Sequence, residues 1–133
     1  MNKIQNYGPL VIRIAVGALF LTTGFSKLAN PDGVIAFLGG LGFGAAAFWA
    51  WLLLLSEIVF GLLILLGGMT KLTVWPLVVI LLVAIFKIYF PSYLDGQNGA
   101  KTDLLFHIVA LASLLSLFLT GAGALSLEAL RKK

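Results

Sequence analysis

Five ionisable residues lie within or beside stretches of sequence that are otherwise apolar: Arg13, Lys27, Glu57, Asp103 and His107. Glu57 is the most informative of them, because it stands in the middle of the run FWAWLLLLSEIVFGLLILL at residues 48–66. A charged side chain at mid-bilayer costs about 2.5 kcal/mol or more, so it needs a partner, a proton or a function. Such side chains can supply hydrogen bonds and a proton route, with Glu57 and His107 as candidate acceptors.

The composition predicts a membrane protein. Of the 133 residues, 61% are hydrophobic and only 11% are charged, whereas soluble domains carry about 25% charged residues. Lipid must therefore be the main solvent of this chain, which is short enough to form one domain over residues 1–133. The net charge of +4 comes largely from the chain ends, so nucleic-acid binding is not expected.

The residue types that are missing exclude several kinds of chemistry. The chain has no cysteine, which excludes a thiol–disulfide mechanism, a cysteine-ligated metal and an iron–sulfur cluster within it. With one histidine and five carboxylates, no metal site is expected. The sequence also carries no haem ligand pair and no nucleotide-binding motif, so the residues themselves name no cofactor.

Four apolar stretches are long enough to cross a bilayer as helices, since a crossing takes roughly 20 residues. They cover residues 9–28, 46–66, 72–90 and 103–121, and the later ones are separated by a tight turn at 67–71 and a polar loop at 91–102. Because lipid cannot satisfy backbone hydrogen bonds, we predict an all-α fold, an up-down bundle of four transmembrane helices. Asn30 as an N-cap and Pro31 at the first helical position predict a short interfacial helix, from residue 31 to about 38, between the first two spans.

The orientation follows from the lysines and arginines outside the spans. The side that holds both termini carries Lys3, Lys71, Arg131, Lys132 and Lys133. The other side carries Lys27, Lys87 and Lys101, diluted by Asp32, Asp95 and Asp103. This excess predicts that both termini are cytoplasmic.

Helical periodicity places the polar residues on stripes of small residues, which let membrane helices pack closely. The stripes are Arg13, Gly17, Phe20, Gly24 and Lys27 in the first span, Ala46, Ala50, Glu57, Gly61 and Gly68 in the second, and Asp103, His107, Ala110, Leu114 and Gly121 in the fourth. At about 1.5 Å per residue, Arg13 lies within reach of Glu57, whereas Lys27 lies too near the outer surface. We therefore predict an Arg13–Glu57 pair in the core and a separate outer cluster of Lys27, Lys87, Asp103 and His107.

Structural interpretations remain open for each of these residues. Arg13 and Lys27 are close enough to the span ends for their side chains to snorkel to the interface. Asp103 could cap the fourth span, and His107 could be a satisfied interior histidine. Glu57 could be a member of a purely structural ion pair.

Several short motifs occur in a characteristic order. The first span contains LVIRIAVGALF and ends in GFSKL, the second continues as SEIVFGLLILLGGMTKL, and residues 120–128 hold Thr-Gly-Ala-Gly followed by Ser-Leu-Glu. Together these motifs resemble the DoxX family over nearly the whole chain. Thr23 stands where that family often has a histidine, for which His107 could substitute, and Asp103 stands where it often has glutamate.

The resemblance implies a four-helix protein of the inner membrane. Some members of the family are subunits linked to thiosulfate:quinone oxidoreduction or to redox-stress complexes, which implies a quinone as ligand and a redox partner subunit. The implied function is a non-catalytic subunit of a membrane redox assembly rather than a stand-alone enzyme. Two alternatives remain: a small-solute carrier, which would require a homo-oligomer because alternating access usually needs paired repeats, and a structural membrane module.

The depth of the ionisable groups predicts a pocket. Lys27, Lys87, Asp103 and His107 gather in the outer half, whereas the cytoplasmic ends of the spans are apolar and closed by the turn at 67–71. We expect the pocket to open toward the outer face and to accept a small, partly apolar molecule.

Overall fold

A computed structural model describes residues 3–132, and all regular secondary structure in this part of the chain is helical. Lys133, one of the cations used to predict the orientation, lies outside the described residues. The elements are η1 (Gln5–Tyr7), α1 (Gly8–Ala29), α2 (Pro31–Gly40), α3 (Ala46–Leu66), α4 (Thr70–Ala84), η2 (Ile85–Tyr89), α5 (Phe90–Leu94), α6 (Ala100–Thr120) and α7 (Leu127–Arg131). The predicted all-α fold is therefore confirmed.

Four helical segments are long and apolar enough to cross a membrane: Gln5–Ala29, Ala46–Leu66, Thr70–Leu94 and Ala100–Thr120. The third is longer than the sequence suggested, because the π-helical η2 and then α5 continue α4 without a break. Pro91 stands two residues after the π-helical turn and does not end this helix. The polar loop predicted at 91–102 is thereby reduced to residues 95–99.

The predicted short helix is α2, which runs from Pro31 to Gly40 and is too short to cross a bilayer. Its N-terminus is capped as expected, because the Gly33 N–H donates to Asn30 Oδ1 at 3.1 Å. The helix ends in a glycine-rich turn in which Gly42 has a φ of 93°, a conformation that favours glycine.

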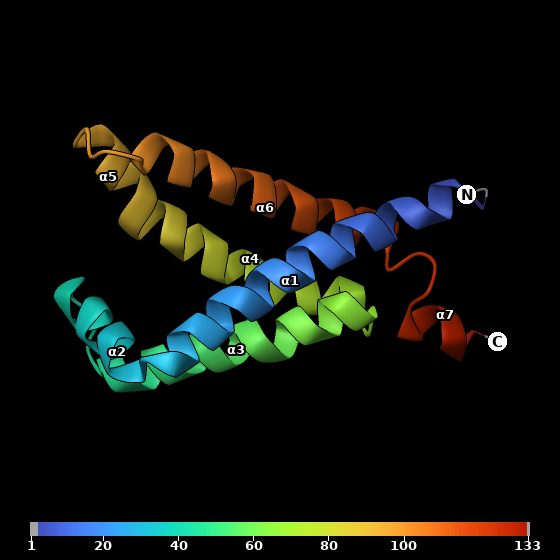
Figure 1. The fold of residues 1–133 in the computed structure, drawn as a ribbon, viewed down its shortest axis with the longest axis horizontal. Helices are drawn as coiled ribbons and strands as arrows, with labels where there is room; N and C mark the ends of the chain where they lie inside the picture. Colours follow the sequence, from blue (N-terminus) through green and yellow to red (C-terminus); the bar gives the residue numbers. More distant parts are fainter. Residues whose placement is uncertain (1–2, 133) are drawn as a thin grey trace.

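The four long helices form two pairs. Figure 1 shows α1 beside α3 and α4 beside α6, with the pairs close together toward the chain termini and spread apart at the other end, where α2 and α5 lie. The buried core lies where the pairs converge and includes Val16, Phe20, Ile64, Leu77 and Leu114. Side chains close the converged end, whereas the spread end leaves space between the pairs.

Glycines set the register between α1 and α3. A Cβ at Gly24 would lie 3.1 Å from the Ile58 nitrogen and 3.2 Å from the Glu57 Cβ, and a Cβ at Gly17 would lie 3.0 Å from the Leu65 nitrogen. The backbones approach closely at both points, as expected for small residues between membrane helices. This contact confirms the predicted small-residue face and places Glu57 opposite Gly24.

Candidate functional site

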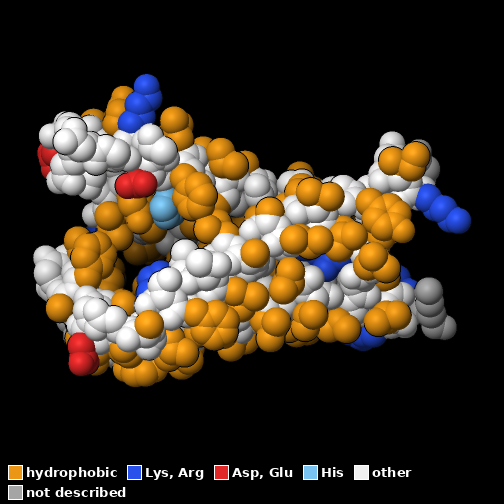
Figure 2. All heavy atoms as spheres, viewed as in Figure 1, with side chains coloured by type: hydrophobic (Ala, Val, Ile, Leu, Met, Phe, Trp, Pro, Cys, Tyr) orange, Lys and Arg blue, Asp and Glu red, His pale blue; other side chains and the backbone are white. Residues whose placement is uncertain are grey.

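The space between the two helix pairs is a pocket of about 1240 Å3. Its lining comes from α1, α2, α3, α4, η2 and α6, and is mostly apolar and aromatic, including Phe20, Phe37, Leu38, Trp49, Phe60, Leu81 and Phe106. Figure 2 shows that the molecule is hollowed at this end. Of the five sequence-predicted site residues, Lys27, Glu57 and His107 line this pocket, whereas Arg13 and Asp103 do not.

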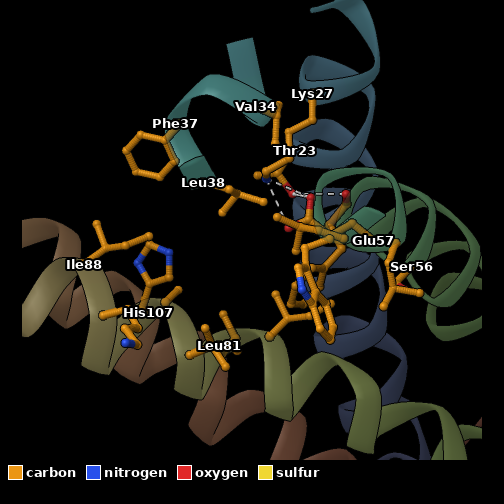
Figure 3. Close-up of a pocket in the computed structure, with 18 of the residues that line it drawn as sticks. Thr23, Lys27, Val34, Phe37, Leu38, Ser56, Glu57, Leu81, Ile88 and His107 are labelled. Carbon is orange, nitrogen blue, oxygen red and sulfur yellow. Dashed lines mark hydrogen bonds and ion pairs between the residues drawn. The ribbon is translucent and has the colours of Figure 1, made fainter. Parts of the chain in front are cut away.

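One wall of the pocket carries a salt bridge between α1 and α3. Lys27 Nζ donates to Glu57 Oε1 at 3.1 Å and to Glu57 Oε2 at 2.9 Å. The Thr23 hydroxyl lies 3.1 Å from Glu57 Oε2 and also 3.1 Å from the carbonyl oxygen of Phe20. Figure 3 shows this group of side chains gathered on one side of the cavity. The Glu57 side chain is 6% exposed and the Lys27 side chain 28%, so the lysine is the partner that reaches the open space.

The helix period explains how this wall forms. Thr23 and Lys27 are four residues apart, so they lie on the same face of α1, one turn from each other. Gly24 has no side chain between them, which lets α3 bring the Glu57 carboxylate close to both. Glu57 thus has an ion pair and a neutral hydrogen-bond donor, which together offset the loss of hydration on burial.

The opposite wall carries His107 on α6. Its Nδ1 atom lies 2.7 Å from the backbone oxygen of Asp103, one helical turn earlier. The ring stacks on Tyr89, with centroids 4.0 Å apart and planes inclined by 28°, and makes a T-shaped contact with Phe106. Tyr89 belongs to the π-helical η2, a wider turn of a kind often found at functional sites. Lys87, from the same segment, also lines the pocket.

The predicted Arg13–Glu57 pair is wrong. Arg13 is fully buried, and its guanidinium donates to backbone oxygens of Leu65, Ala122 and Ala124 at 2.7 Å and of Leu125 at 3.1 Å. The prediction assumed that the first two spans begin at matching depths. Because Glu57 lies opposite Gly24, Arg13 is about 16 Å away along the helix axis.

The predicted outer cluster is also corrected in part. Lys27 is not separate from Glu57 but is its ion-pair partner. Asp103 is exposed, and it does not cap α6, because the N-cap residue is Gly99. Asp103 holds His107 through its backbone oxygen.

Two residues of the site were not predicted from the sequence. Thr23 was noted only as a departure from a family pattern, although its spacing of four from Lys27 was a usable signal. The sequence-based predictions give Tyr89 no place in the site. Its contact with His107 depends on the π-helical turn, which helical periodicity does not predict.

The pocket combines a few polar groups, which can form hydrogen bonds with a ligand, with a mostly apolar lining. Lys27 supplies a cation with donor hydrogens, Glu57 a carboxylate, and His107 a titratable ring. The aromatic lining offers faces on which a flat ring can stack. The pocket is therefore suited to a molecule with a polar ring and an apolar body.

Comparison with known proteins gives the relatives of this chain. The family model described as DoxX matches residues 8–89. The chain is 30% identical to "Inner membrane protein YqjF" of Escherichia coli (strain K12) over 133 residues, which are 100% of this chain and 98% of that protein. It is 29% identical to "Putative oxidoreductase CatD" of Bacillus subtilis (strain 168) over 128 residues, 96% of this chain and 90% of the relative. No solved structure matches the chain significantly. By the family model and by the extent of these similarities, the chain is a membrane protein that belongs to the DoxX family.

Proposed function

We propose that this protein is the quinone-binding subunit of a redox assembly in the inner membrane. The observation that carries the proposal is the pocket of about 1240 Å3, which is lined by aromatic and aliphatic side chains and has a Lys27–Glu57 pair on one wall and His107 on the other. A quinone combines a flat polar ring with an apolar tail. The polar groups would bind the ring oxygens, and the aromatic and aliphatic side chains would contact the ring faces and the tail.

The chain itself supplies binding and proton-handling groups. Its candidate proton acceptors are Glu57 and His107, while the electrons for quinone chemistry would pass to or from a partner subunit. The name of the B. subtilis relative, which includes the word oxidoreductase, is consistent with such a partner. The chain is thus proposed as a non-catalytic subunit.

Two alternative functions predict different structures. A purely structural module would be expected to have a filled core with its ion pairs enclosed, whereas here the Lys27–Glu57 pair borders a large pocket. A carrier would need the pocket to open alternately to both sides. The pocket lies at the spread end of the bundle, and at the converged end the core fills the space between the helix pairs. The quinone-binding function is therefore favoured.

The proposed orientation places both termini in the cytoplasm and the pocket toward the outer face. It is supported by the position of the termini at one end of the bundle, together with Lys3, Lys71, Arg131 and Lys132. The pocket lies at the opposite end. A quinone would then enter from the lipid of the outer leaflet.

Quenching of tryptophan fluorescence by decylubiquinone, with the protein in nanodiscs, tests the proposed function. Trp49 lines the pocket and Trp51 does not, so Trp49→Phe should remove most of the saturable quenching and Trp51→Phe should retain it. Glu57→Gln removes the anion that holds the Lys27 ammonium at the wall, and should weaken binding about tenfold. Ser113→Ala, on α6 but outside the pocket, serves as the control.

Two results would contradict the proposal. One is quenching that does not saturate and is equal for all variants, which would show that the quinone dissolves only in the bilayer. The other is a loss of binding that merely follows a loss of folding, measured as the melting temperature, which would favour the structural module.

A further inference from the structure

The hydrogen bond of His107 determines which ring nitrogen carries hydrogen. Nδ1 lies 2.7 Å from the carbonyl oxygen of Asp103, and a carbonyl oxygen can only accept. Nδ1 is therefore the donor. In the neutral imidazole the other nitrogen, Nε2, then has no hydrogen and acts as an acceptor.

The ring presents this acceptor to the pocket. One face of the ring stacks on Tyr89, Phe106 makes a T-shaped contact with it, and Nδ1 is turned to the helix backbone, so Nε2 lies on the side of the ring away from that backbone. Figure 3 shows His107 projecting into the cavity, across from the wall that carries Glu57. A ligand that meets His107 therefore encounters a hydrogen-bond acceptor.

The facing wall presents mainly a donor. The Lys27 ammonium has three hydrogens and contacts two Glu57 oxygens, so one hydrogen remains for a ligand. The Glu57 oxygens already accept from Lys27 and Thr23, and the side chain is almost wholly buried. The two walls thus call for a ligand with an accepting oxygen at one end and a donating hydroxyl at the other.

We infer that the pocket prefers the reduced, hydroquinone form of its ligand to the oxidised quinone. This inference rests on the proposed function and adds the redox state that the site selects. A hydroquinone oxygen can accept from Lys27 while the other hydroxyl donates to His107 Nε2. A quinone has only acceptors, so its second carbonyl would face the Nε2 lone pair, and neither group would gain a hydrogen bond from the other.

Such a mismatch is costly in a pocket whose lining is mostly apolar and aromatic. A buried acceptor left without its hydrogen bond weakens binding by about tenfold or more. If the pocket binds hydroquinone about tenfold more tightly, the two-electron potential of the bound couple rises by about 30 mV. The bound quinone would then be a stronger electron acceptor than the free quinone in the bilayer.

Both redox forms of decylubiquinone, titrated into the protein in nanodiscs without oxygen, test this preference. Because the chain has no cysteine, the reductant that keeps the hydroquinone reduced does not alter protein thiols. The wild-type protein should bind the hydroquinone about tenfold more tightly than the quinone. His107→Phe keeps an aromatic ring beside Tyr89 but removes the acceptor, and should abolish the preference by weakening hydroquinone binding alone.

Two further variants separate the inference from the proposed function. His107→Gln retains an acceptor and should keep part of the preference, whereas Glu57→Gln should weaken both forms to a similar extent. Equal wild-type affinities for the two forms, or a preference that survives in His107→Phe, would overturn the inference and leave the proposed function intact. Failure of the wild-type protein to bind either form would overturn both.

Discussion

The side chains of Lys27 and Glu57 differ in exposure. This difference decides how much stability the protein loses when either side chain is replaced. The Glu57 side chain is 6% exposed and depends on Lys27 and Thr23 for its hydrogen bonds. The Lys27 side chain is 28% exposed and can extend into the pocket if its partner is removed. Removal of Lys27 leaves a buried carboxylate without its cation, and this destabilises the protein more than removal of Glu57 does.

The corresponding prediction is a double-mutant cycle. Lys27→Met should lower the free energy of unfolding by about 3 kcal/mol, because it leaves the buried carboxylate without its cation. Glu57→Gln should lower it by about 1 kcal/mol, since glutamine keeps a hydrogen-bonding group. The double variant should resemble Glu57→Gln alone, because no charge is then stranded. Denaturation of the four proteins in one detergent measures these differences, and simple addition of the two single effects would show that the residues do not interact.

At the scale of helices, the sequence predicted which faces of α1 and α3 pack together, but not how far the two helices are shifted along their axes. The stripes of small residues on α1 and α3 do pack against each other, as the contacts of Gly17 and Gly24 show. Periodicity gives the direction in which a side chain points, and this is a local property. The relative depth of two helices depends on the connection between them. Here α2 intervenes, so α3 extends beyond the end of α1, and the partner of Glu57 is Lys27 instead of Arg13.

Periodicity also failed to predict the tertiary contacts in the pocket wall that the other helix pair forms. The apolar run that forms α4 was visible in the sequence, as was the presence of His107 on the fourth span. Helical periodicity does not predict the π-helical turn at Ile85–Tyr89, which brings Tyr89 onto His107.

Arg13 joins three elements at the converged end of the bundle. Its guanidinium donates to Leu65 at the end of α3 and to Ala122, Ala124 and Leu125 in the segment between α6 and α7. That segment also reaches the start of the chain, since the Ala124 N–H donates to the Asn6 oxygen. Glu128 accepts from the Thr70 N–H at the start of α4, and its own N–H donates to the Gly67 oxygen. The C-terminal segment is thus fixed to the turn between α3 and α4.

Arg13→Gln should therefore lower the free energy of unfolding by about 3 kcal/mol, because most of these charge-assisted hydrogen bonds are lost and buried carbonyl groups are left without donors. Arg131→Gln is the matched control, since Arg131 is exposed at the end of α7, and it should change stability by less than about 0.5 kcal/mol. Thermal unfolding and limited proteolysis of the C-terminal segment measure both effects. Equal stability of the two variants would show that Arg13 does not hold the segment in place.

At the scale of the whole molecule, the two ends of the bundle differ in construction. The converged end has an apolar core and the Arg13 contacts, and it holds both termini. The spread end has the pocket, with α2 beside it: Val34, Phe37 and Leu38 line the cavity in Figure 3. Large apolar side chains such as Val11, Val109 and Leu119 are exposed on the outside of the bundle, as expected where lipid is the solvent.

The orientation of this asymmetric bundle decides which side of the membrane the pocket serves. The terminal end carries Lys3, Lys71, Arg131 and Lys132, and the positive-inside rule then predicts a cytoplasmic location for it. Because the natural chain has no cysteine, Lys3→Cys, Asn98→Cys and Lys132→Cys each create a unique site for a membrane-impermeant thiol reagent. In intact cells or right-side-out vesicles, only Asn98→Cys should react, since Asn98 is exposed in the loop between α5 and α6 at the pocket end. Reaction of the Lys3 or Lys132 positions from outside, with Asn98→Cys protected, would reverse the orientation and would place the pocket on the cytoplasmic side.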